Sequence, residues 1–566
     1  MKKKDVKLGQ MLLNDGIITS EQLDAALIEH KKTGQLIGDV IVALGFATDE
    51  QVLLALSHQI GVLYIRLKEF DISPGIIEKV SAKFACYYKI MPVDMSGRRL
   101  RIAVTNPLDL AVLDEIRLVL KCDLDPVLAG EKDILDAIKK YYGVGADTID
   151  KIIGKAYTQD DVPTQAEQSG NIDDIADDAS IIKFVNQLLQ QAVSERATDI
   201  HIEPFEGELR IRYRVDGILS SANIPPNIKY LYQAIVSRIK IMSALNIAER
   251  RLPQDGRIKI NVANTDLDLR VSVIPTSYGE SVHIRILSAN VLLGLESLGL
   301  LKDDLDVVDK MIKKPHGILF VTGPTGSGKT TTLYACLNRV NDEGKNIITI
   351  EDPIEYQLRG ITQIQVNTKV GLTFAAGLRS MLRHDPDIMM VGEVRDLETA
   401  EIAIRVALTG HLVFSTLHTN DSTGAVTRLL DMGIEPYLVS SSIEAVIAQR
   451  LVRVICDKCR REILPDEGLI KELNLDTPGS IKFYEGKGCP FCKFTGFMGR
   501  TAIYEILVLD DEIRELIVRR VPSNEIKALA LKKGMRTLFN DGMIKVGRGI
   551  TTIKEVLRVT EIEAEE

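Results

Sequence analysis

The sequence predicts an α/β fold accompanied by smaller domains, and three observations support this prediction. The chain has 566 residues, which is too long for a single hydrophobic core. Short apolar runs at 317–322, 347–350 and 388–391 have the length and composition of buried strands. A glycine-rich turn joins the first run to a segment of helix formers, as in open sheets that are covered by helices.

The composition is that of an ordinary globular protein. Apolar residues make up 45% of the chain, charged residues 26%, and the formal net charge is −9. This acidic balance argues against a dedicated nucleic-acid-binding protein. The sequence has no run near the roughly 20 apolar residues that span a bilayer, and its Met-Lys-Lys-Lys start lacks the apolar part of a signal peptide. We therefore expect a cytoplasmic protein.

An internal repeat opens the first predicted domain, residues 1–143. Residues 7–30 are echoed by residues 36–59. Each copy predicts a short apolar helix, a glycine turn, and a second helix that begins after a threonine and has glutamate in its first positions. After the repeat, residues 100–107 alternate as a strand does, and residues 110–120 have helical periodicity.

Residues 144–178 have the composition of a flexible acidic linker, with paired aspartates among Gln, Ser, Thr and Gly. Periodicity resumes at residues 181–192, which form one apolar helical face, and alternating strands follow. We predict a small α+β, PAS-like domain over residues 179–290. Its later strands carry Arg270 and Arg285 on polar faces.

The glycine-rich turn matches every fixed position of the phosphate loop G-x-x-x-x-G-K-[ST]. Its glycines let backbone N–H groups turn toward phosphates, and the following helix adds a favourable dipole. We expect Lys329 to reach the β- and γ-phosphates and Thr330 to ligate Mg²⁺. The alternative is a chance glycine-rich turn, which the strand–loop–helix context disfavours. The residues expected to bind the nucleotide are Gly323, Pro324, Thr325, Gly326, Ser327, Gly328, Lys329, Thr330 and Thr331.

Acidic residues follow two further predicted strands, at positions where ligands bind in an open sheet. Glu351 and Glu355 follow the strand at 347–350. Glu393 follows the strand at 388–391 in a Walker B arrangement, placed to orient or deprotonate an attacking water. Taken alone, Glu351 and Glu355 are better explained as helix-start acids that stabilise a dipole.

Basic residues add to this pattern. His411 and His418 flank a third predicted strand near Phe414, and Arg379 and Arg383 are spaced one helical turn apart, hence on one face. A single histidine is more often structural, and the arginines also fit a solvated helix face. All four residues follow the same phosphate loop in the chain, and each lies near the end of a strand in one predicted sheet. This arrangement favours a shared site.

Four cysteines form two C-x-x-C pairs, Cys456 with Cys459 and Cys489 with Cys492. Four thiolates on paired turns fit a tetrahedral Zn²⁺, and a closed site of this kind has a structural role. Free buried thiols are the alternative. We predict a zinc-binding insertion over about 454–498.

Together these motifs resemble the type II/type IV secretion ATPase superfamily, and above all its assembly motors for type II secretion and type IV pili. The resemblance covers nearly the whole chain and implies a RecA-like ATPase core over residues 291–566. The segments that carry it are Gly323–Thr330, Glu351–Glu355, Arg383–Arg395, Thr409–Asn420, Ala197–Pro204, Arg251–Arg257 and the cysteine pairs.

The resemblance implies a homohexamer that binds ATP with Mg²⁺ and works peripherally at the inner membrane, with the N-terminal region engaging the machine's membrane platform. Glu351–Glu355 correspond to the aspartate box, Glu393 to the Walker B acid, and both histidines to the histidine box. The arginines that correspond to nucleotide-facing ones are Arg270, Arg285, Arg379 and Arg383. Surface ion pairs, worth at most about 1 kcal/mol each, are the alternative for Arg270 and Arg285.

The N-terminal repeat resembles a cyclic-di-GMP-binding motif found in some of these ATPases. It departs from that motif at Lys7 and Leu36, which stand where arginine is expected, and at His30, which stands where glutamine is expected. Lysine cannot reproduce the planar guanidinium, so a docking domain without ligand is favoured over cyclic-di-GMP binding.

Other interpretations stay open. The pattern Asp199-x-His201-x-Glu203 is a weak candidate for a metal site, because no fourth ligand is evident. A nucleotide-gated regulator without hydrolysis and a RecA-like nucleic-acid translocase are alternatives to the motor. The full set of acids argues against the first, and the acidic net charge argues against the second.

Overall fold

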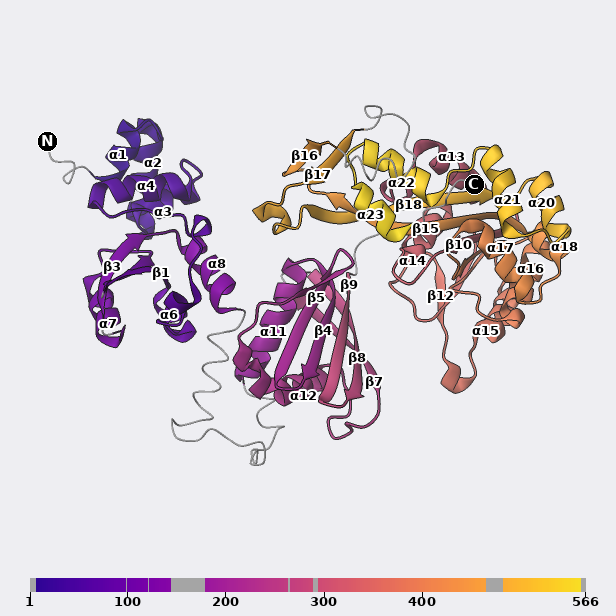
Figure 1. Ribbon diagram of the computed structural model, residues 1–566, viewed down its shortest axis with the longest axis horizontal. Coiled ribbons are helices and arrows are strands. Elements are labelled where there is room, and N and C mark those ends of the chain that lie inside the picture. Colours follow the sequence, from indigo (N-terminus) through magenta and orange to yellow (C-terminus); the bar gives the residue numbers. More distant parts are fainter. Residues whose placement is uncertain are drawn as a thin grey trace. The chain divides into compact units, whose positions relative to one another are not determined.

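The structure is a computed structural model that describes residues 7–97, 99–120, 122–143, 179–262, 265–288, 294–464 and 482–560. The chain divides into two compact units, with the boundary between Ile286 and Leu287. Figure 1 shows their helices and strands. The predicted linker, residues 144–178, lies outside the described residues.

The repeat folds into four helices, as predicted, and a small apolar core around Leu12 and Ile41 holds them together. Each second helix begins with a capping box, in which Thr19 pairs with Gln22 and Thr48 with Gln51. The threonine caps and the glutamates in the first turns, Glu21 and Glu50, confirm the prediction, and a glutamine three positions after each threonine completes the box. The helices are α1 (Leu8–Asn14), α2 (Ser20–Thr33), α3 (Ile37–Ala43) and α4 (Asp49–Ile60).

A three-stranded sheet follows the repeat, with the strand order β1-β2-β3. Strands β1 and β2 are antiparallel, and β2 and β3 are parallel. The elements are η2 (Leu67–Glu69), α5 (Pro74–Ile77), α6 (Ala82–Tyr88), β1 (Ile90–Ser96), β2 (Arg99–Val104), α7 (Leu110–Leu120), β3 (Asp123–Leu128) and α8 (Glu131–Tyr142).

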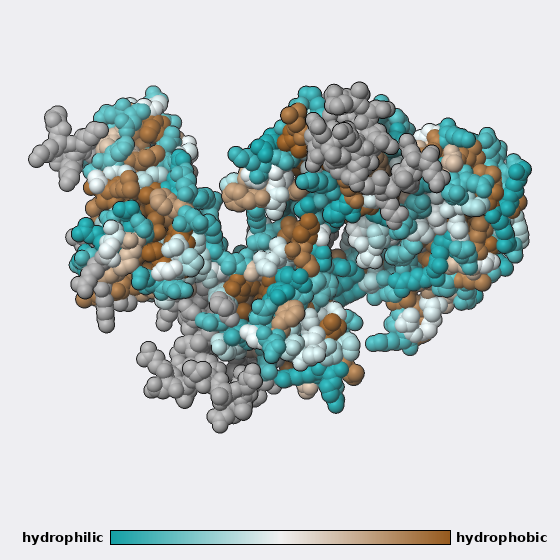
Figure 2. Space-filling view, viewed as in Figure 1, coloured by the Kyte–Doolittle hydropathy of each residue, from teal (hydrophilic) through white to brown (hydrophobic). Residues whose placement is uncertain are grey.

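Apolar side chains gather on the visible face of this N-terminal part in Figure 2. Among the exposed large apolar residues are Ile28, Leu36 and Leu63, whose exposed fractions are 57%, 73% and 61%. Apolar side chains that gather on one exposed face are typical of surfaces that contact a partner.

The rest of the first unit is a six-stranded sheet with the order β6-β5-β4-β9-β8-β7. One face packs against helices through buried residues such as Ile200, Tyr213 and Ile284, and the alternating residues form a polar face. The elements are α11 (Ala179–Ser194), β4 (Ala197–Phe205), β5 (Glu208–Val215), β6 (Ile218–Ser221), η3 (Pro226–Leu231), α12 (Tyr232–Met242), β7 (Gln254–Val262), β8 (Thr265–Thr276) and β9 (Gly279–Ser288).

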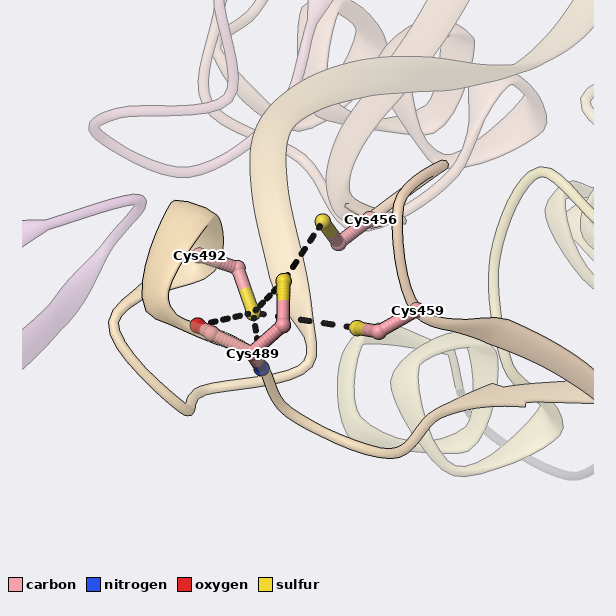
Figure 3. Close-up of side chains that lie close together, drawn as sticks. All are labelled: Cys456, Cys459, Cys489 and Cys492. Carbon is pink, nitrogen blue, oxygen red and sulfur yellow. Dashed lines mark hydrogen bonds between the residues drawn. The ribbon is translucent and has the colours of Figure 1, made fainter. Parts of the chain in front are cut away.

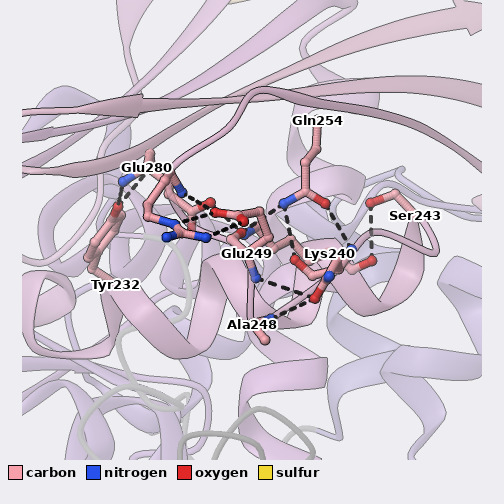
Figure 4. A network of polar contacts seen from close by, with 9 residues as sticks. Tyr232, Lys240, Ser243, Ala248, Glu249, Gln254 and Glu280 are labelled. Atoms are coloured by element: carbon pink, nitrogen blue, oxygen red, sulfur yellow. Dashed lines mark hydrogen bonds and ion pairs between the residues drawn. The ribbon is translucent and has the colours of Figure 1, made fainter.

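A buried lysine organises the loop between α12 and β7 (Figure 4). The Lys240 side chain is 1% exposed, pairs with Glu280 and donates a hydrogen bond of 2.8 Å to the Glu249 carbonyl. The Gln254 amide holds the same loop by donating to the carbonyls of Asn246 and Glu249. This part of the 251–257 segment thus stabilises the local fold.

The second unit is a three-layer α/β/α domain (Figure 1). Its seven-stranded sheet has the order β12-β11-β13-β14-β10-β15-β18, in which only the edge strand β18 runs antiparallel to its neighbour. Alternate residues of the central strands, such as Phe320 and Leu319 of β10, enter two separate hydrophobic cores. The sheet is therefore buried on both faces, as its apolar runs predict.

The elements of this unit follow the predicted order. They are η4 (Leu295–Ser297), α13 (Lys302–Met311), β10 (Gly317–Thr322), α14 (Lys329–Val340), β11 (Ile347–Glu351), β12 (Thr362–Gln365), η5 (Thr368–Val370), α15 (Phe374–Met381), η6 (Leu382–His384), β13 (Ile388–Val391), α16 (Leu397–Leu408), β14 (Leu412–Leu417), α17 (Ser422–Asp431) and α18 (Pro436–Ser442).

The last part of the chain adds a long hairpin and a small two-stranded sheet, β16-β17. The elements are β15 (Ile443–Ile455), β16 (Arg460–Ile463), β17 (Phe483–Gly486), η7 (Pro490–Cys492), β18 (Phe497–Val508), α20 (Asp511–Val518), α21 (Ser523–Lys532), α22 (Leu538–Gly547) and α23 (Ile553–Val559). Among the described residues, no helix combines the length and apolar character that a bilayer crossing requires.

Candidate active site

The carboxyl ends of four parallel strands bring the predicted acids and the phosphate loop to one edge of the sheet. Thr322 at the end of β10 lies opposite Leu417 at the end of β14, and Val391 at the end of β13 lies opposite Ser415. The loops after these strands carry the phosphate loop, His418 and Glu393. Strand β11, beside β13, ends at Glu351.

Glycines in the phosphate loop are required by the strand behind it. Gly323 has φ +151° and Gly328 has φ +89°, which side chains rarely tolerate. A Cβ atom at Gly323 would lie 2.6 Å from the carbonyl oxygen of Gln449, and one at Gly328 would lie 2.8 Å from Gln449 Nε2. Gln449 of β15 therefore supports the loop. The sequence interpretation did not assign it this role, because it lies more than a hundred residues away along the chain.

Lys329 folds back over the phosphate loop. Its Nζ donates hydrogen bonds to the carbonyls of Gly323, at 2.7 Å, and Pro324, at 3.1 Å. Burial lowers the pKa of Lys329 to about 8, Glu393 opposes this change, and the positive charge of Arg450 adds to it. The Ser327 hydroxyl is buried and has no hydrogen-bond partner in the described part of the chain. An ammonium and a buried hydroxyl without a partner, in a glycine-rich loop directly before the start of α14, fit a polyphosphate.

Glu393 lies between two basic side chains. One of its oxygens is 2.7 Å from Arg395 Nε and 3.4 Å from His418 Nε2. The carboxylate is 12% exposed, whereas His418 is 45% exposed. The predicted proximity of Glu393, His418 and the phosphate loop is thus present within one chain, and Lys329 is close enough to Glu393 for its pKa to respond.

Side-chain hydrogen bonds link the loops at this edge. Thr322, the last residue before the phosphate loop, has its hydroxyl 2.7 Å from the Thr419 hydroxyl and accepts a hydrogen bond from the Thr419 amide at 2.9 Å. Thr416 donates to the Gly392 carbonyl at 2.7 Å. The position of His418 is therefore coupled to both neighbouring loops.

Glu351 is 3% exposed and interacts mainly with the protein. Its carboxylate accepts hydrogen bonds from the Tyr334 hydroxyl, from Thr349 at 2.6 Å and from Gln363 at 3.1 Å. The Tyr334 hydroxyl also accepts a hydrogen bond of 3.3 Å from the Glu355 amide. Burial and the adjacent Glu351 charge raise the pKa of Tyr334 above its usual range. Tyr334 thus anchors the Glu351–Glu355 loop, a role that the sequence interpretation missed.

Two predicted residues, His411 and Arg383, are not brought to this edge within one chain. His411 precedes β14, and its carbonyl accepts a hydrogen bond from Gly317 at the start of β10, so it lies at the amino end of the sheet. The α-helix that holds Arg379 ends at Met381. Arg383 therefore lies in the following 3₁₀ turn, where its guanidinium donates to the Arg379 carbonyl at 3.0 Å.

Arg379 and Arg383 therefore do not share one face of a continuous helix. The helix ends between them, and the Arg383 side chain caps its end. The neighbouring His384 carbonyl accepts a hydrogen bond from the side chain of Asn346, the residue before β11. Arg379 forms an ion pair with Glu398. The other two predicted arginines, Arg270 and Arg285, lie in the first unit.

The four cysteines converge on one point (Figure 3). All four sulfur atoms lie within 4.8 Å of one another. The Sγ distances are 3.9 Å for Cys456–Cys489, 3.8 Å for Cys459–Cys492 and 3.7 Å for Cys489–Cys492. Sulfur atoms at the corners of a tetrahedral zinc site, with Zn–S bonds of about 2.3 Å, lie about 3.8 Å apart. The amides of Cys489 and Gly496 donate to Cys492 Sγ, as expected for a thiolate.

The Asp199-x-His201-x-Glu203 pattern does not form a metal cluster among the described residues. Asp199 accepts hydrogen bonds from His283 and Arg285, each at 3.0 Å. Glu203 accepts two hydrogen bonds from Arg212. Both carboxylates are therefore committed to neighbouring basic side chains.

Comparison with known proteins places this geometry in a family. Residues 174–558 match the sequence profile described as Type II/IV secretion system protein. The chain belongs to this family. Residues 60–148 match the MshEN domain, so this match follows the helical repeat and does not include it.

Curated relatives of this family member cover almost its whole length. The type IV pilus assembly ATPase PilB of Myxococcus xanthus is 42% identical over 97% of this chain and 98% of that protein. The type II secretion system protein E of Xanthomonas campestris pv. campestris is 43% identical over 97% of this chain and 96% of that protein. Both machines are thus represented at nearly equal identity.

A solved structure confirms the fold. The ATPase DotB of Legionella pneumophila is 23% identical, has a TM-score of 0.50, and covers 67% of this chain and 95% of its own. The second unit is therefore a RecA-like ATPase domain, as predicted from the phosphate loop and strand order.

Proposed function

We propose that this secretion ATPase hydrolyses Mg-ATP as a homohexameric motor that powers pseudopilus assembly for type II secretion. The observation that carries the proposal is the position of Glu393, which lies at the same sheet edge as the phosphate loop and is within 3.4 Å of His418 Nε2. A carboxylate beside a phosphate-binding loop is suited to orient or deprotonate an attacking water.

Each residue at the edge has a distinct role in the proposal. Lys329 leaves the loop carbonyls and pairs with the β- and γ-phosphates, and the Ser327 hydroxyl and the loop amides donate hydrogen bonds to the remaining phosphate oxygens. Thr330 holds Mg²⁺, which when bound neutralises developing phosphate charge. His418 orients Glu393. Glu351 and Glu355 shape the loop beside the metal.

Arginines complete the proposed site. Arg270 and Arg285 close onto the triphosphate from the preceding domain, so that hydrolysis is coupled to domain movement. Their positions on the polar sheet face support this role, because both side chains point away from the helical core. Arg383 and His411 lie at the amino edge of the sheet and would serve a nucleotide only across a contact between subunits, whereas Arg379 pairs with Glu398 in the first turn of α16.

A type IV pilus extension motor is the alternative to a type II secretion motor, since relatives of both kinds match at similar identity. In either case we propose a cytoplasmic protein held at the inner membrane by platform and cytoplasmic-domain proteins of the machine, without nucleic acid. The exposed apolar residues of the N-terminal part support its use as a docking domain.

Cyclic-di-GMP binding by the repeat is the alternative to a docking domain without ligand. Lys7 is the N-cap residue of α1, and Leu36, at the matching position of α3, is 73% exposed. Neither offers the guanidinium that the resembling motif uses. Binding of cyclic-di-GMP to the purified protein, compared with Lys7→Ala, tests this directly.

The test of the proposed function is ATP hydrolysis and ATP binding by wild type and Glu393→Gln. We expect hydrolysis by the variant to fall at least a hundredfold, with ATP affinity changed less than threefold. Absence of turnover in wild type, even with the platform proteins, would favour a regulator. Turnover stimulated by DNA with a steep dependence on salt would favour a translocase.

A further inference from the structure

The polar face of the six-stranded sheet carries a cross-strand row of charges centred on Asp199. The strand register places Asp199 of β4 opposite Arg214 of β5 on one side and Arg285 of β9 on the other. In the next row His201 lies opposite His283. Neighbouring residues such as Ile200 and Ile284 point into the helical core, so this row lies on the face without helices.

Asp199 is the shared acceptor of this row. Its side chain is 7% exposed, and one oxygen accepts hydrogen bonds from His283 Nε2 and Arg285 Nε, each at 3.0 Å. The other oxygen accepts a hydrogen bond of 2.7 Å from the Thr198 hydroxyl and lies 4.0 Å from Arg214 Nε. Burial alone raises the pKa of Asp199, but the hydrogen bonds from His283, Thr198 and Arg285 outweigh it and hold the pKa well below its usual range.

The way Arg285 is held differs from a closed ion pair. Arg212 on the same face donates from both Nε and Nη2 to the two oxygens of Glu203, which engages one whole edge of its guanidinium. Arg285 instead donates to Asp199 through Nε, and its side chain is 47% exposed. A guanidinium fixed at Nε keeps its terminal Nη groups for a second, anionic partner.

The histidines restrict the same carboxylate from the other side. The rings of His201 and His283 contact each other in a tilted arrangement, with centroids 4.7 Å apart and an angle of 37° between their planes. This packing holds the His283 ring against Asp199. Because Thr198 and His283 both donate hydrogen bonds to it, the Asp199 carboxylate has little freedom to rotate. The hydrogen bond from Arg285 Nε to this fixed carboxylate then sets the direction of the guanidinium.

We infer that Asp199 is a positioning residue for ATP hydrolysis, which aims the terminal guanidinium groups of Arg285 at the phosphates. The inference rests on the proposed function, because it requires Arg285 to meet the nucleotide. It adds a residue whose carboxylate never touches the nucleotide and acts only by fixing the arginine that does. Misplacement of a transition-state group by about 1 Å costs up to a hundredfold in rate, which sets the expected scale.

A double-mutant cycle tests the inference. Steady-state hydrolysis is measured for the full chain, Asp199→Asn, Arg285→Ala and the double variant under conditions in which wild type is active. We expect Asp199→Asn to lower kcat between about tenfold and a hundredfold with KM changed less than threefold. In the Arg285→Ala background the same substitution should have no further effect, because the group that it positions is gone.

A matched control and a milder variant separate positioning from folding. Glu203→Gln breaks the Arg212 ion pair on the same strand and face, and should leave kcat within twofold. Thr198→Ala removes one hydrogen bond to Asp199 and should lower kcat a few-fold, again only when Arg285 is present. It also keeps the test decisive if Asp199→Asn fails to fold, as judged from its thermal unfolding.

The outcomes distinguish the two claims. If Arg285→Ala hydrolyses ATP at the wild-type rate, the proposed role of Arg285 is wrong, whatever the Asp199 variant does. If Arg285→Ala is impaired but the Asp199 and Thr198 variants are active, or their effects multiply with that of Arg285→Ala, Asp199 does not position the arginine.

Discussion

The His418 imidazole Nε2 lies 3.4 Å from the Glu393 carboxylate, on the same oxygen that Arg395 Nε contacts at 2.7 Å. These two contacts hold Glu393 through basic side chains, whereas Glu351 is held by Tyr334, Thr349 and Gln363. The contact between His418 and Glu393 depends on the loop that follows β14. This loop is anchored to Thr322, beside the phosphate loop.

Removing the imidazole should therefore slow hydrolysis without weakening nucleotide binding. We expect His418→Gln to lower kcat about tenfold to a hundredfold at nearly constant ATP affinity, because Glu393 is then held by Arg395 alone. His384→Gln is the matched control, since that histidine lies in the 3₁₀ turn at the other edge. Equal effects of the two substitutions would show that the His418–Glu393 contact has no catalytic importance.

The depressed pKa of Lys329 predicts a pH dependence of nucleotide binding. Without nucleotide, Lys329 loses its proton as the pH rises through about 8, whereas a bound triphosphate stabilises the charged form. Binding above pH 8 must therefore take up a proton, and affinity should fall by up to tenfold per pH unit.

Titration calorimetry of ATP at pH 8.5 or so, in buffers of different ionisation enthalpy, counts this proton uptake. Lys329→Arg is the control, because arginine keeps its proton throughout this range and should show no uptake. An affinity that is constant between neutral and alkaline pH would contradict the prediction.

Tyr334 should matter for stability and for the loop it anchors. Tyr334→Phe leaves the buried Glu351 carboxylate without one donor and the Glu355 amide without its acceptor. We expect the free energy of unfolding of the second unit to fall by about 1–3 kcal/mol. Chemical denaturation measures this, with Tyr437→Phe at a 61% exposed position as the control. A cost below about 0.5 kcal/mol for Tyr334→Phe would show that the hydroxyl is dispensable.

Metal analysis tests the cysteine cluster. We expect one zinc ion per chain in the protein as purified, lost in Cys459→Ser and retained in Cys122→Ser, whose thiol lies outside the cluster. Loss of zinc should lower the midpoint of thermal unfolding by about 5 °C or more. Because a site with four thiolates has no open position, hydrolysis at low temperature should persist. Full zinc content in Cys459→Ser would refute the four-cysteine site.

The site could be predicted from the sequence where a reactive side chain directly follows a predicted strand. Glu393 and His418 were found in this way, since parallel strands present their carboxyl ends at one edge. His411 was assigned to the same site, but it precedes its strand, and the two ends of a strand lie on opposite edges. Gln449 and Tyr334 escaped prediction, because their roles come from packing between segments far apart in sequence.

The fold, too, could be predicted where an element leaves a periodic pattern in the sequence, and not where local hydrogen bonds decide its end. Apolar runs and helical periodicity predicted the central strands and the four repeat helices well. The helix of Arg379 ends earlier than its spacing predicts, because a 3₁₀ turn and a side-chain cap from Arg383 replace its last turn. Such local hydrogen bonds are not visible in periodicity.

Strand β15 connects the phosphate loop to the cysteine cluster. It passes behind the phosphate loop at Gln449 and, after an irregularity in its pairing between Arg453 and Ile455, ends immediately before the first cysteine of the cluster, Cys456. Seven residues of extended chain span about 23 Å. A paired strand resists compression, so we expect a displacement at the phosphate loop to be carried along β15 to the cysteine cluster.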